Sequence, residues 1–265
     1  TGVGLFDLER VLDTNEPLNK ELIIAPPEFT ISYVGFNTSA SFKGEPNPLS
    51  DPKFRQALNH AIDKELIASE VLSDLVLPAY SILPPGFPGY SPNIQGLRYD
   101  AELARRLLSE SKFSDSKSFD PITITVPGTG GTIGLDLEVI IEMWRQELGI
   151  EVEIQQVEWA TYLEDLEKQK YQAYAGLGWQ ADYPDPQDFL DILFHTKSSL
   201  NHGAYSNADL DAILERARVE QDVVKRVDLY NQAERIIVAD AAWVPLWFQG
   251  ERHVLLKPNI IGYRL

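Results

Sequence analysis

One stretch near the middle of the chain constrains the fold more than any other. Residues 122–126 are all β-branched, residues 135–148 carry apolar side chains at helical spacing, and residues 150–154 alternate between apolar and acidic side chains. A strand, a helix and a strand in this order form a crossover unit, with parallel strands and a right-handed connection. A parallel pair needs helices over its sheet, so the stretch predicts an α/β fold.

The rest of the chain also alternates between helical and strand patterns. Asp51 followed by Pro52 predicts the beginning of a helix, because Asp suits the N-cap and Pro fits the first turn. Apolar residues continue at helical spacing from Phe54 to Val71, and Asp100 is expected to cap a further helix. The other expected elements are a short helix within residues 5–12, a strand at 30–37, a helix at 159–170, a strand at 171–178, helices at about 207–218 and 222–239, and a hairpin-like pair of strands at 244–249 and 252–257.

Composition excludes several classes of protein and site. The 265 residues carry 23 Lys and Arg against 40 Asp and Glu, a formal net charge of −17, whereas a nucleic-acid binder needs a basic surface. The sequence has no Cys, which excludes thiol nucleophiles and thiolate metal sites. The four His are scattered without metal-binding spacing, and no apolar run approaches the roughly 18 residues of a membrane span. We therefore expect no metal, no cofactor and no nucleic acid.

A glycine-rich loop between Gly128 and Gly134 follows the first strand of the crossover unit and precedes its helix. Phosphate-binding loops occupy this position, so a nucleotide-dependent enzyme is one alternative. The glycine spacing, however, is G-x-G-G-x-x-G rather than G-x-G-x-x-G, and no Lys followed by Ser or Thr completes a P-loop. Glycines are also needed for a tight turn from strand to helix, and the sequence favours this interpretation.

The segment 176–186, Gly-Leu-Gly-Trp-Gln-Ala-Asp-Tyr-Pro-Asp-Pro, is more informative. Its glycines allow another backbone to approach closely, Trp179 offers a flat apolar wall, and Asp182 could receive an ammonium group. The same residues also fit a plain turn, in which Asp182 or Asp185 caps a helix and Trp179 joins the core. The physical chemistry of the segment leaves both interpretations open.

Several motifs resemble those of a known family. Residues 50–64, Ser-Asp-Pro-Lys-Phe-Arg-Gln-Ala-Leu-Asn-His-Ala-Ile-Asp-Lys, resemble the D-x-x-x-R-Q-A-L-x-x-A-I-D-(K/R) helix of the oligopeptide/dipeptide-binding family of ABC-transporter solute receptors (family 5 type). The resemblance continues, in order, through Pro78-Ala79-Tyr80, Pro84-Pro85, Tyr99-Asp100, Leu148-Gly149-Ile150-Glu151-Val152, Glu158-Trp159, Gly178-Trp179-Gln180-Ala181-Asp182-Tyr183-Pro184-Asp185-Pro186, Tyr230-Asn231-Gln232-Ala233-Glu234, and Lys257-Pro258 with Gly262. It covers nearly the whole chain.

The resemblance implies a fold, a function and a set of site residues. The fold is a type II periplasmic-binding-protein-like lobe, an α/β unit with a mixed sheet flanked by helices, in a two-lobed receptor that closes on its ligand. Such a receptor is not an enzyme: it captures oligo- or dipeptides and delivers them to the permease subunits of an ABC transporter. Asp182 occupies the position of the aspartate in the family's W-x-A-D-Y motif, and the resemblance implies that it receives the peptide's α-amino group. The backbone of Gly178 and Gln180 would pair with the peptide main chain, and Trp179 and Trp159 would line side-chain pockets.

The resemblance also implies how the chain is organised. Residues 1–29 are expected to be a remnant of the N-terminal lobe and the first hinge crossing, residues 30–256 the C-terminal ligand-binding lobe, and residues 257–265 the second crossing. The receptor is expected to be a monomer outside the cytoplasm, either periplasmic or anchored to the cell surface as a lipoprotein. Some relatives bind oligosaccharides or nickel complexes, which stay alternative ligands. Where family members place His or Arg near the ligand carboxylate, this chain has Ile133 and Leu166.

Overall fold

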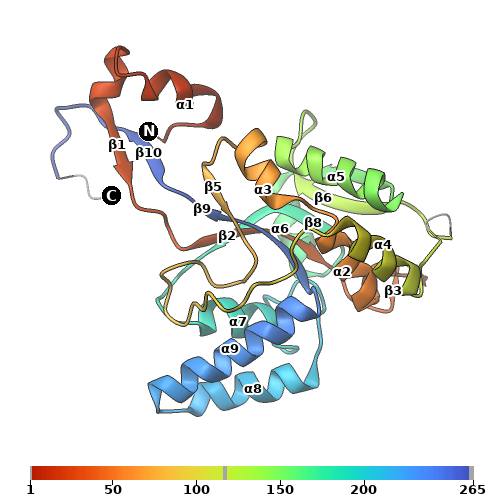
Figure 1. Cartoon of the computed structure of the whole chain (residues 1–265). Coiled ribbons are helices and arrows are strands. Elements are labelled where there is room, and N and C mark those ends of the chain that lie inside the picture. The colour runs from red at the N-terminus through yellow and green to blue at the C-terminus, as the bar shows by residue number, and fades with distance from the viewer. Residues whose placement is uncertain (1, 116–117, 263–265) are drawn as a thin grey trace.

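A six-stranded mixed sheet forms the centre of the molecule (Figure 1). The computed structural model describes residues 2–115 and 118–262. The strands lie in the order β5 (Val76–Pro78), β9 (Trp243–Gln249), β2 (Thr30–Phe36), β8 (Ala173–Gln180), β6 (Ile122–Pro127) and β7 (Val152–Val157). Strand β6 is parallel to β7 and to β8, and the other neighbouring pairs are antiparallel. The predicted crossover unit is confirmed, with α5 (Leu135–Leu148) between β6 and β7.

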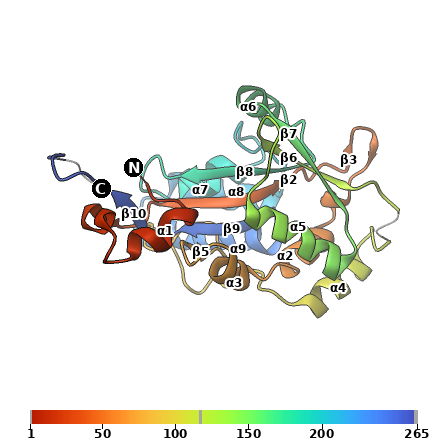
Figure 2. The ribbon, with the colours of Figure 1, turned by 90° about the horizontal axis from the view of Figure 1, so that it is seen from above.

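Helices cover both faces of this sheet (Figure 2). One apolar core lies between the sheet and α2 (Pro52–His60), α4 (Ala101–Glu110) and α5; the other lies between the sheet and α6 (Trp159–Glu167), α7 (Gln187–Phe194), α8 (Ala208–Val219) and α9 (Val223–Ala239). Successive side chains of β2 supply both cores: Ile31 and Tyr33 face α6–α9, and Val34 and Phe36 face α2 and α5. The predicted α/β class, with a mixed sheet flanked by helices, is confirmed.

The helix that begins after Asp51 is shorter than its apolar spacing predicts. Asp51 caps α2 as expected, but the helix ends at His60. Asp63 then begins a new turn, because its side chain accepts a hydrogen bond from the amide three residues further on. The elements that follow are α3 (Lys64–Leu66) and the single helical turn η3 (Ile67–Val71). A capping side chain inside a continuous apolar repeat thus divides one predicted helix into shorter ones.

The hairpin predicted within residues 244–257 is wrong. Strands β9 and β10 (Arg252–Leu255) follow one another, but β9 pairs with β2 and β5, whereas β10 pairs with β1 (Leu22–Ala25). Strand β1 was not among the elements expected from the sequence. Instead of closing a turn, the Gly250 amide donates to the Leu75 carbonyl at 3.2 Å. Local alternation predicts a strand but not its partner, which here comes from a distant part of the chain.

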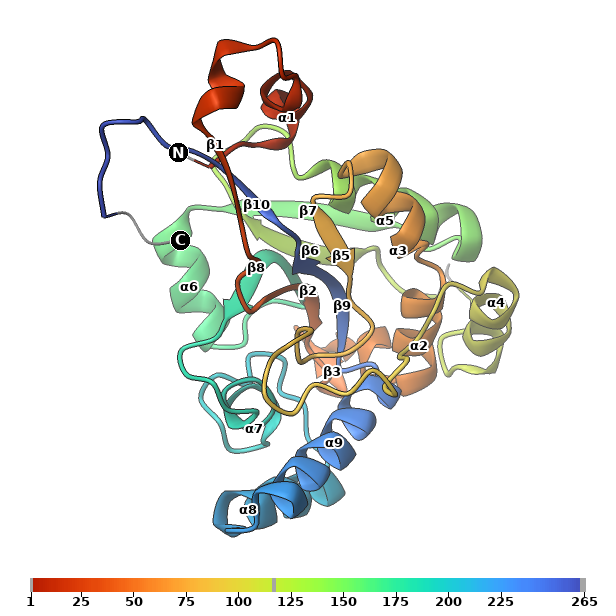
Figure 3. The same ribbon diagram turned by 60° about the vertical axis from the view of Figure 1, so that its left-hand side comes forward.

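Strands β1 and β10 form a two-stranded ribbon that leaves the main sheet, with α1 (Leu5–Leu12) beside it, while α8 and α9 form a helical hairpin at the other end of the molecule (Figure 3). The remaining short elements are η1 (Pro17–Glu21), β3 (Ser41–Phe42), β4 (Glu45–Pro46) and η2 (Pro48–Ser50). Among the described residues, no helix combines the length and the apolar character needed to cross a bilayer.

Candidate functional site

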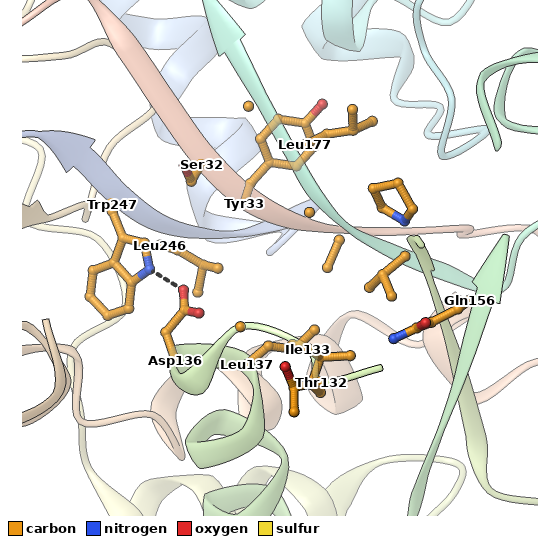
Figure 4. Close-up of a pocket in the computed structure, with 16 residues that line it drawn as sticks. Ser32, Tyr33, Thr132, Ile133, Asp136, Leu137, Gln156, Leu177, Leu246 and Trp247 are labelled. Carbon is orange, nitrogen blue, oxygen red and sulfur yellow. Dashed lines mark hydrogen bonds between the residues drawn. The ribbon is translucent and has the colours of Figure 1, made fainter. Parts of the chain in front are cut away.

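A cavity of about 470 Å³ opens where strands β8 and β6 separate (Figure 4). Strands β2, β6, β7, β8 and β9 and the first turn of α5 all contribute to its walls. Lining side chains from different elements include Tyr33, Asp136, Gln156, Leu177 and Trp247. Concave sites to which many segments contribute are where small ligands usually bind.

A bulge at Gly176 causes this separation. Between its pairs with β2 at Tyr174 and Leu177, β8 has one residue more than β2. Gly176 has φ of +77°, and a Cβ at this position would lie 2.9 Å from Cδ of Pro127, so only glycine fits here without strain. Strand β8 therefore pairs with β6 only as far as Tyr174. In the described part of the chain, no strand pairs with this edge of β8 over residues 175–180.

The unpaired edge presents backbone groups of Gly178 and Gln180. The Ala181 amide donates to the Phe29 carbonyl at 2.9 Å, on the β2 side. Backbone groups alternate between the two edges of an extended strand, so the amides of Gln180 and Gly178 face the edge away from β2. Both residues are exposed. This edge can therefore accept one further extended chain by strand addition.

Asp182 lies just beyond the end of this edge, and it is exposed. Its amide donates to Oδ2 of Asp188 at 2.9 Å, which holds the turn. Within the described part of the chain, the Asp182 carboxylate accepts no hydrogen bond and forms no ion pair. Asp185 takes the capping role instead, since it accepts a hydrogen bond from the Gln187 amide at 2.9 Å and pairs with Arg226. The carboxylate of Asp182 is thus available to a ligand.

The two candidate tryptophans occupy different places. Trp179, on β8, is partly buried and packs against the core beneath α6 and α7. Trp159 begins α6, is 50% exposed and stacks on Tyr162 with 6.2 Å between ring centroids. The Tyr162 hydroxyl donates to the Ala175 carbonyl at 3.0 Å, which ties α6 to the beginning of the unpaired edge.

The five predicted residues therefore lie in one region of the molecule, but they do not all line the cavity. Gly178, Trp179, Gln180 and Asp182 follow one another along β8 and its C-terminal turn, and only Gly178 among them lines the cavity. Trp159 reaches the same strand indirectly, through Tyr162. Sequence reasoning missed the lining residues Asp136, Gln156 and Trp247, because they come from three separate elements and no local pattern marks them.

The glycine-rich loop forms one wall of the cavity, and Gln156 holds it in place. The Gln156 side chain accepts a hydrogen bond from the Gly130 amide at 2.7 Å and donates one to the Gly131 carbonyl at 3.1 Å. The Gly128 amide donates to the Val157 carbonyl at 2.8 Å. The amides of Gly128 and Gly130 are thus bonded within the protein and are not free for a phosphate, which weakens the nucleotide alternative. Among the residues described, no cluster of three or more His, Cys, Asp or Glu is placed to hold a metal ion.

The Pro-rich segment 79–89 packs behind the turn that carries Asp182. Phe87 contacts Phe29 edge-on, with 5.2 Å between ring centroids, and Phe29 is the residue that pairs with the end of β8. Gly89 lies against Pro186, since a Cβ on Gly89 would be 2.7 Å from Cγ of that proline. The position of the segment therefore affects the position of the turn.

Two buried ionisable side chains hold this segment from behind. Oε1 of Glu234 accepts hydrogen bonds from the amides of Ile82 and Leu83 at 2.7 and 2.8 Å. Nζ of Lys64 donates to the Ala79 carbonyl at 3.0 Å. Burial raises the pKa of Glu234 to about 7, against the effect of its two backbone hydrogen bonds. Burial also lowers the pKa of Lys64 to about 7.

These shifts predict opposite effects of pH on folding stability. From the ordinary pKa of 4.5 up to about 7, folded Glu234 keeps a proton that the unfolded chain has lost, so its contribution to stability falls as pH rises. From about 7 up to the ordinary pKa of 10.5, unfolded Lys64 holds a proton that the folded chain lacks, so stability rises with pH. Urea unfolding of wild type and Glu234→Gln across pH 4.5–7 should show a relative loss of roughly 1–3 kcal/mol in the wild type.

The variant Lys64→Met serves as the matched comparison for this measurement. It should keep the wild-type pH dependence below pH 7 and lose the rise in stability above pH 7. If wild type and both variants had parallel pH profiles, the two side chains would not be titrating as their burial predicts.

Residues 6–201 match the sequence model of the family described as "Bacterial extracellular solute-binding proteins, family 5 Middle". The chain is 27% identical over 213 residues to the oligopeptide-binding protein OppA of Bacillus subtilis, covering 78% of this chain and 39% of that protein. It is 28% identical over 247 residues to the periplasmic murein peptide-binding protein MppA of Escherichia coli, covering 91% of this chain and 44% of that protein. The chain thus spans less than half the length of these relatives.

A solved structure agrees with these matches. The oligopeptide-binding protein AppA from Bacillus subtilis, in complex with a nonapeptide, superimposes with a TM-score of 0.79 at 25% identity. The overlap covers 100% of this chain and 52% of the AppA chain. The likeness confirms the predicted periplasmic-binding-protein-like lobe of type II.

Proposed function

Because the chain belongs to family 5 of the bacterial extracellular solute-binding proteins, we propose that it forms the ligand-binding lobe of a peptide receptor. The receptor captures oligo- or dipeptides between two lobes and delivers them to the permease subunits of an ABC transporter. The observation that carries this proposal is the unpaired edge of β8, which borders the cavity and leads to the available carboxylate of Asp182. A chain edge beside an exposed carboxylate suits a ligand that has both an extended backbone and a free amino group.

In the proposed complex the peptide runs antiparallel to β8. Its α-ammonium group pairs with Asp182, and its first residues hydrogen-bond with the backbone of Gln180 and Gly178. Trp159, which is half exposed, offers a flat surface to a ligand side chain, and Trp179 lines a second pocket from its partly buried position. Closure of the receptor removes water from these contacts and strengthens them.

The domain organisation follows the same proposal. Residues 1–29 belong to the N-terminal lobe and the first hinge crossing, residues 30–256 are the C-terminal lobe, and residues 257–265 are the second crossing, of which 263–265 lie outside the described residues. The ribbon of β1 and β10 supports two neighbouring crossings, because these strands leave the main sheet side by side, although β10 itself falls within residues 30–256 (Figure 1). A lobe without its partner offers half a cleft and is expected to bind ligand weakly.

The proposal also covers location and partners. The receptor works as a monomer outside the cytoplasm, in the periplasm or anchored to the cell surface through a lipid, and its role is binding without catalysis. The relatives MppA and OppA carry names that describe peptide binding, which supports a peptide over the alternative sugars and nickel complexes.

Thermal unfolding of the complete receptor with candidate ligands tests this function. Free short peptides should raise the melting temperature, since a ligand at 100 times its Kd adds about 2.7 kcal/mol to the stability of the state that it binds. Oligosaccharides, nickel complexes and nucleotides are the comparison ligands and should produce no shift. Stabilisation by nucleotides alone would refute the receptor function and favour an enzyme that uses the glycine-rich loop.

A further inference from the structure

The described side chains that line the cavity beside β8 include one carboxylate and no cation. Among the described residues that line it, Asp136 is the only one with an ionisable acidic or basic side chain apart from Tyr33, and none is Lys, Arg or His. A ligand carboxylate that entered this cavity would find a negative charge and no cation to balance it. A ligand cation would find one carboxylate and no competing positive charge.

Asp136 is held in a defined position. It lies in the first turn of α5, where the positive end of the helix dipole favours a negative side chain. Its Oδ2 accepts a hydrogen bond from Nε1 of Trp247 at 2.8 Å, and Trp247 is buried in β9 (Figure 4). Oδ1 of Asp136 accepts no hydrogen bond from the described residues. The bond at Oδ2 thus orients the carboxylate, and Oδ1 can accept a hydrogen bond from a ligand in the cavity.

The strand geometry indicates which part of a peptide reaches this cavity. Gly178 lines the cavity and is four positions before Asp182 on the chain, which corresponds to roughly 13 Å of extended strand. A peptide whose amino terminus pairs with Asp182 advances about 3.4 Å per residue along the same edge. About 13 Å corresponds to roughly four residues of the peptide, so the side chains that pass the cavity are those of the third to fifth residues, and not the terminal amino group.

We propose that Asp136 makes this cavity selective for a basic side chain, so that the preferred ligands are peptides with Lys or Arg at one of positions three to five. This inference rests on the proposed peptide-binding function. Selectivity comes from attraction of an ammonium or guanidinium group and from rejection of acidic side chains and of a nearby ligand carboxylate. Peptides whose terminal carboxylate falls in the cavity are disfavoured for the same reason.

Calorimetric titration of the complete receptor with alanine heptapeptides, whose terminal carboxylate lies beyond the tested positions, tests the assignment. Each peptide carries Lys, norleucine or Glu at position three, four or five, and norleucine matches the apolar stem of Lys without its charge. At one of these positions the Lys peptide should bind at least about tenfold more tightly than the norleucine peptide, and the Glu peptide more weakly than either. In Asp136→Asn, which keeps an acceptor for Trp247, the Lys and norleucine peptides should bind almost equally.

The control is Glu102→Gln, which removes one charge from the first turn of α4, an exposed site away from the cavity. It should leave the preference for Lys unchanged. If peptides bind with no preference for Lys, or if the preference survives in Asp136→Asn, the role of Asp136 is refuted while the receptor function stands. If none of the peptides binds, the proposed function fails, and this inference fails with it.

Discussion

Replacement of Asp182 by Ala is expected to weaken the binding of a peptide with a free amino terminus by roughly 100-fold, or about 3 kcal/mol. The Asp182 carboxylate has no partner in the described part of the chain, so its replacement should not disturb the turn, which is held through the backbone amide of the same residue. In the closed receptor the ammonium group would stay buried without its counter-charge, which is the main source of the loss. Calorimetric titration of the complete receptor measures the effect.

Acetylation of the peptide provides the complementary experiment. An N-acetylated peptide should bind poorly to the wild type, and Asp182→Ala should bind it no worse than the wild type does, because the interaction is already absent. Asp228→Ala removes a carboxylate from the exposed face of α9 and is the control for net charge. Equal affinities of the free and acetylated peptides for the wild type would show that Asp182 does not bind the amino group.

Replacement of Arg55 by Met should destabilise the fold by about 3–5 kcal/mol. Arg55 is 3% exposed, and its guanidinium group donates to the carbonyls of Leu49, Asp240 and Ala241 at 2.8, 2.7 and 3.0 Å. It joins the beginning of α2 to the connection between α9 and β9. Methionine fills a similar volume, but it leaves these carbonyls without a donor where water has little access.

Urea unfolding of the complete receptor, followed by tryptophan fluorescence, measures this loss. Arg106→Met, on the exposed side of α4, is the matched control and should change stability by less than about 0.5 kcal/mol. A similarly small change for Arg55→Met would mean that water replaces the guanidinium group at the three carbonyls. Arg55 belongs to one of the family motifs, and the structure gives it a structural role rather than one at the cavity.

Local patterns predicted most of the elements correctly. The β-branched run at 122–126 became β6, and Asp51 and Asp100 cap α2 and α4. The helices expected near 159, 207 and 222 are confirmed as α6, α8 and α9. These features depend on side-chain spacing and on bonds between residues a few positions apart, which a sequence displays directly.

The divided helix after Asp51 reflects a local cap at Asp63, whereas the other errors concern contacts between distant segments. Strand β1 has only four residues and is recognisable as a strand only through its pairing with β10. The predicted hairpin failed because β9 finds partners in β2 and β5. The sequence left open whether a helix follows Asp185, and the ion pair between Asp185 and Arg226 of α9 holds the beginning of α7. The stability of such strand pairs and ion pairs depends on tertiary packing, and the local propensity of the residues does not reveal it.

The sequence by itself determined the α/β class, the family resemblance and the segment that carries Trp179 and Asp182, because each is a property of neighbouring residues. The tertiary structure alone decided that the bulge at Gly176 frees one edge of β8, that Asp185 rather than Asp182 caps the next helix, and that Asp136 faces the resulting cavity. Each depends on which backbone and side-chain groups find partners across the sheet. A group that is left without a partner is available to a ligand, and only the complete set of contacts identifies it.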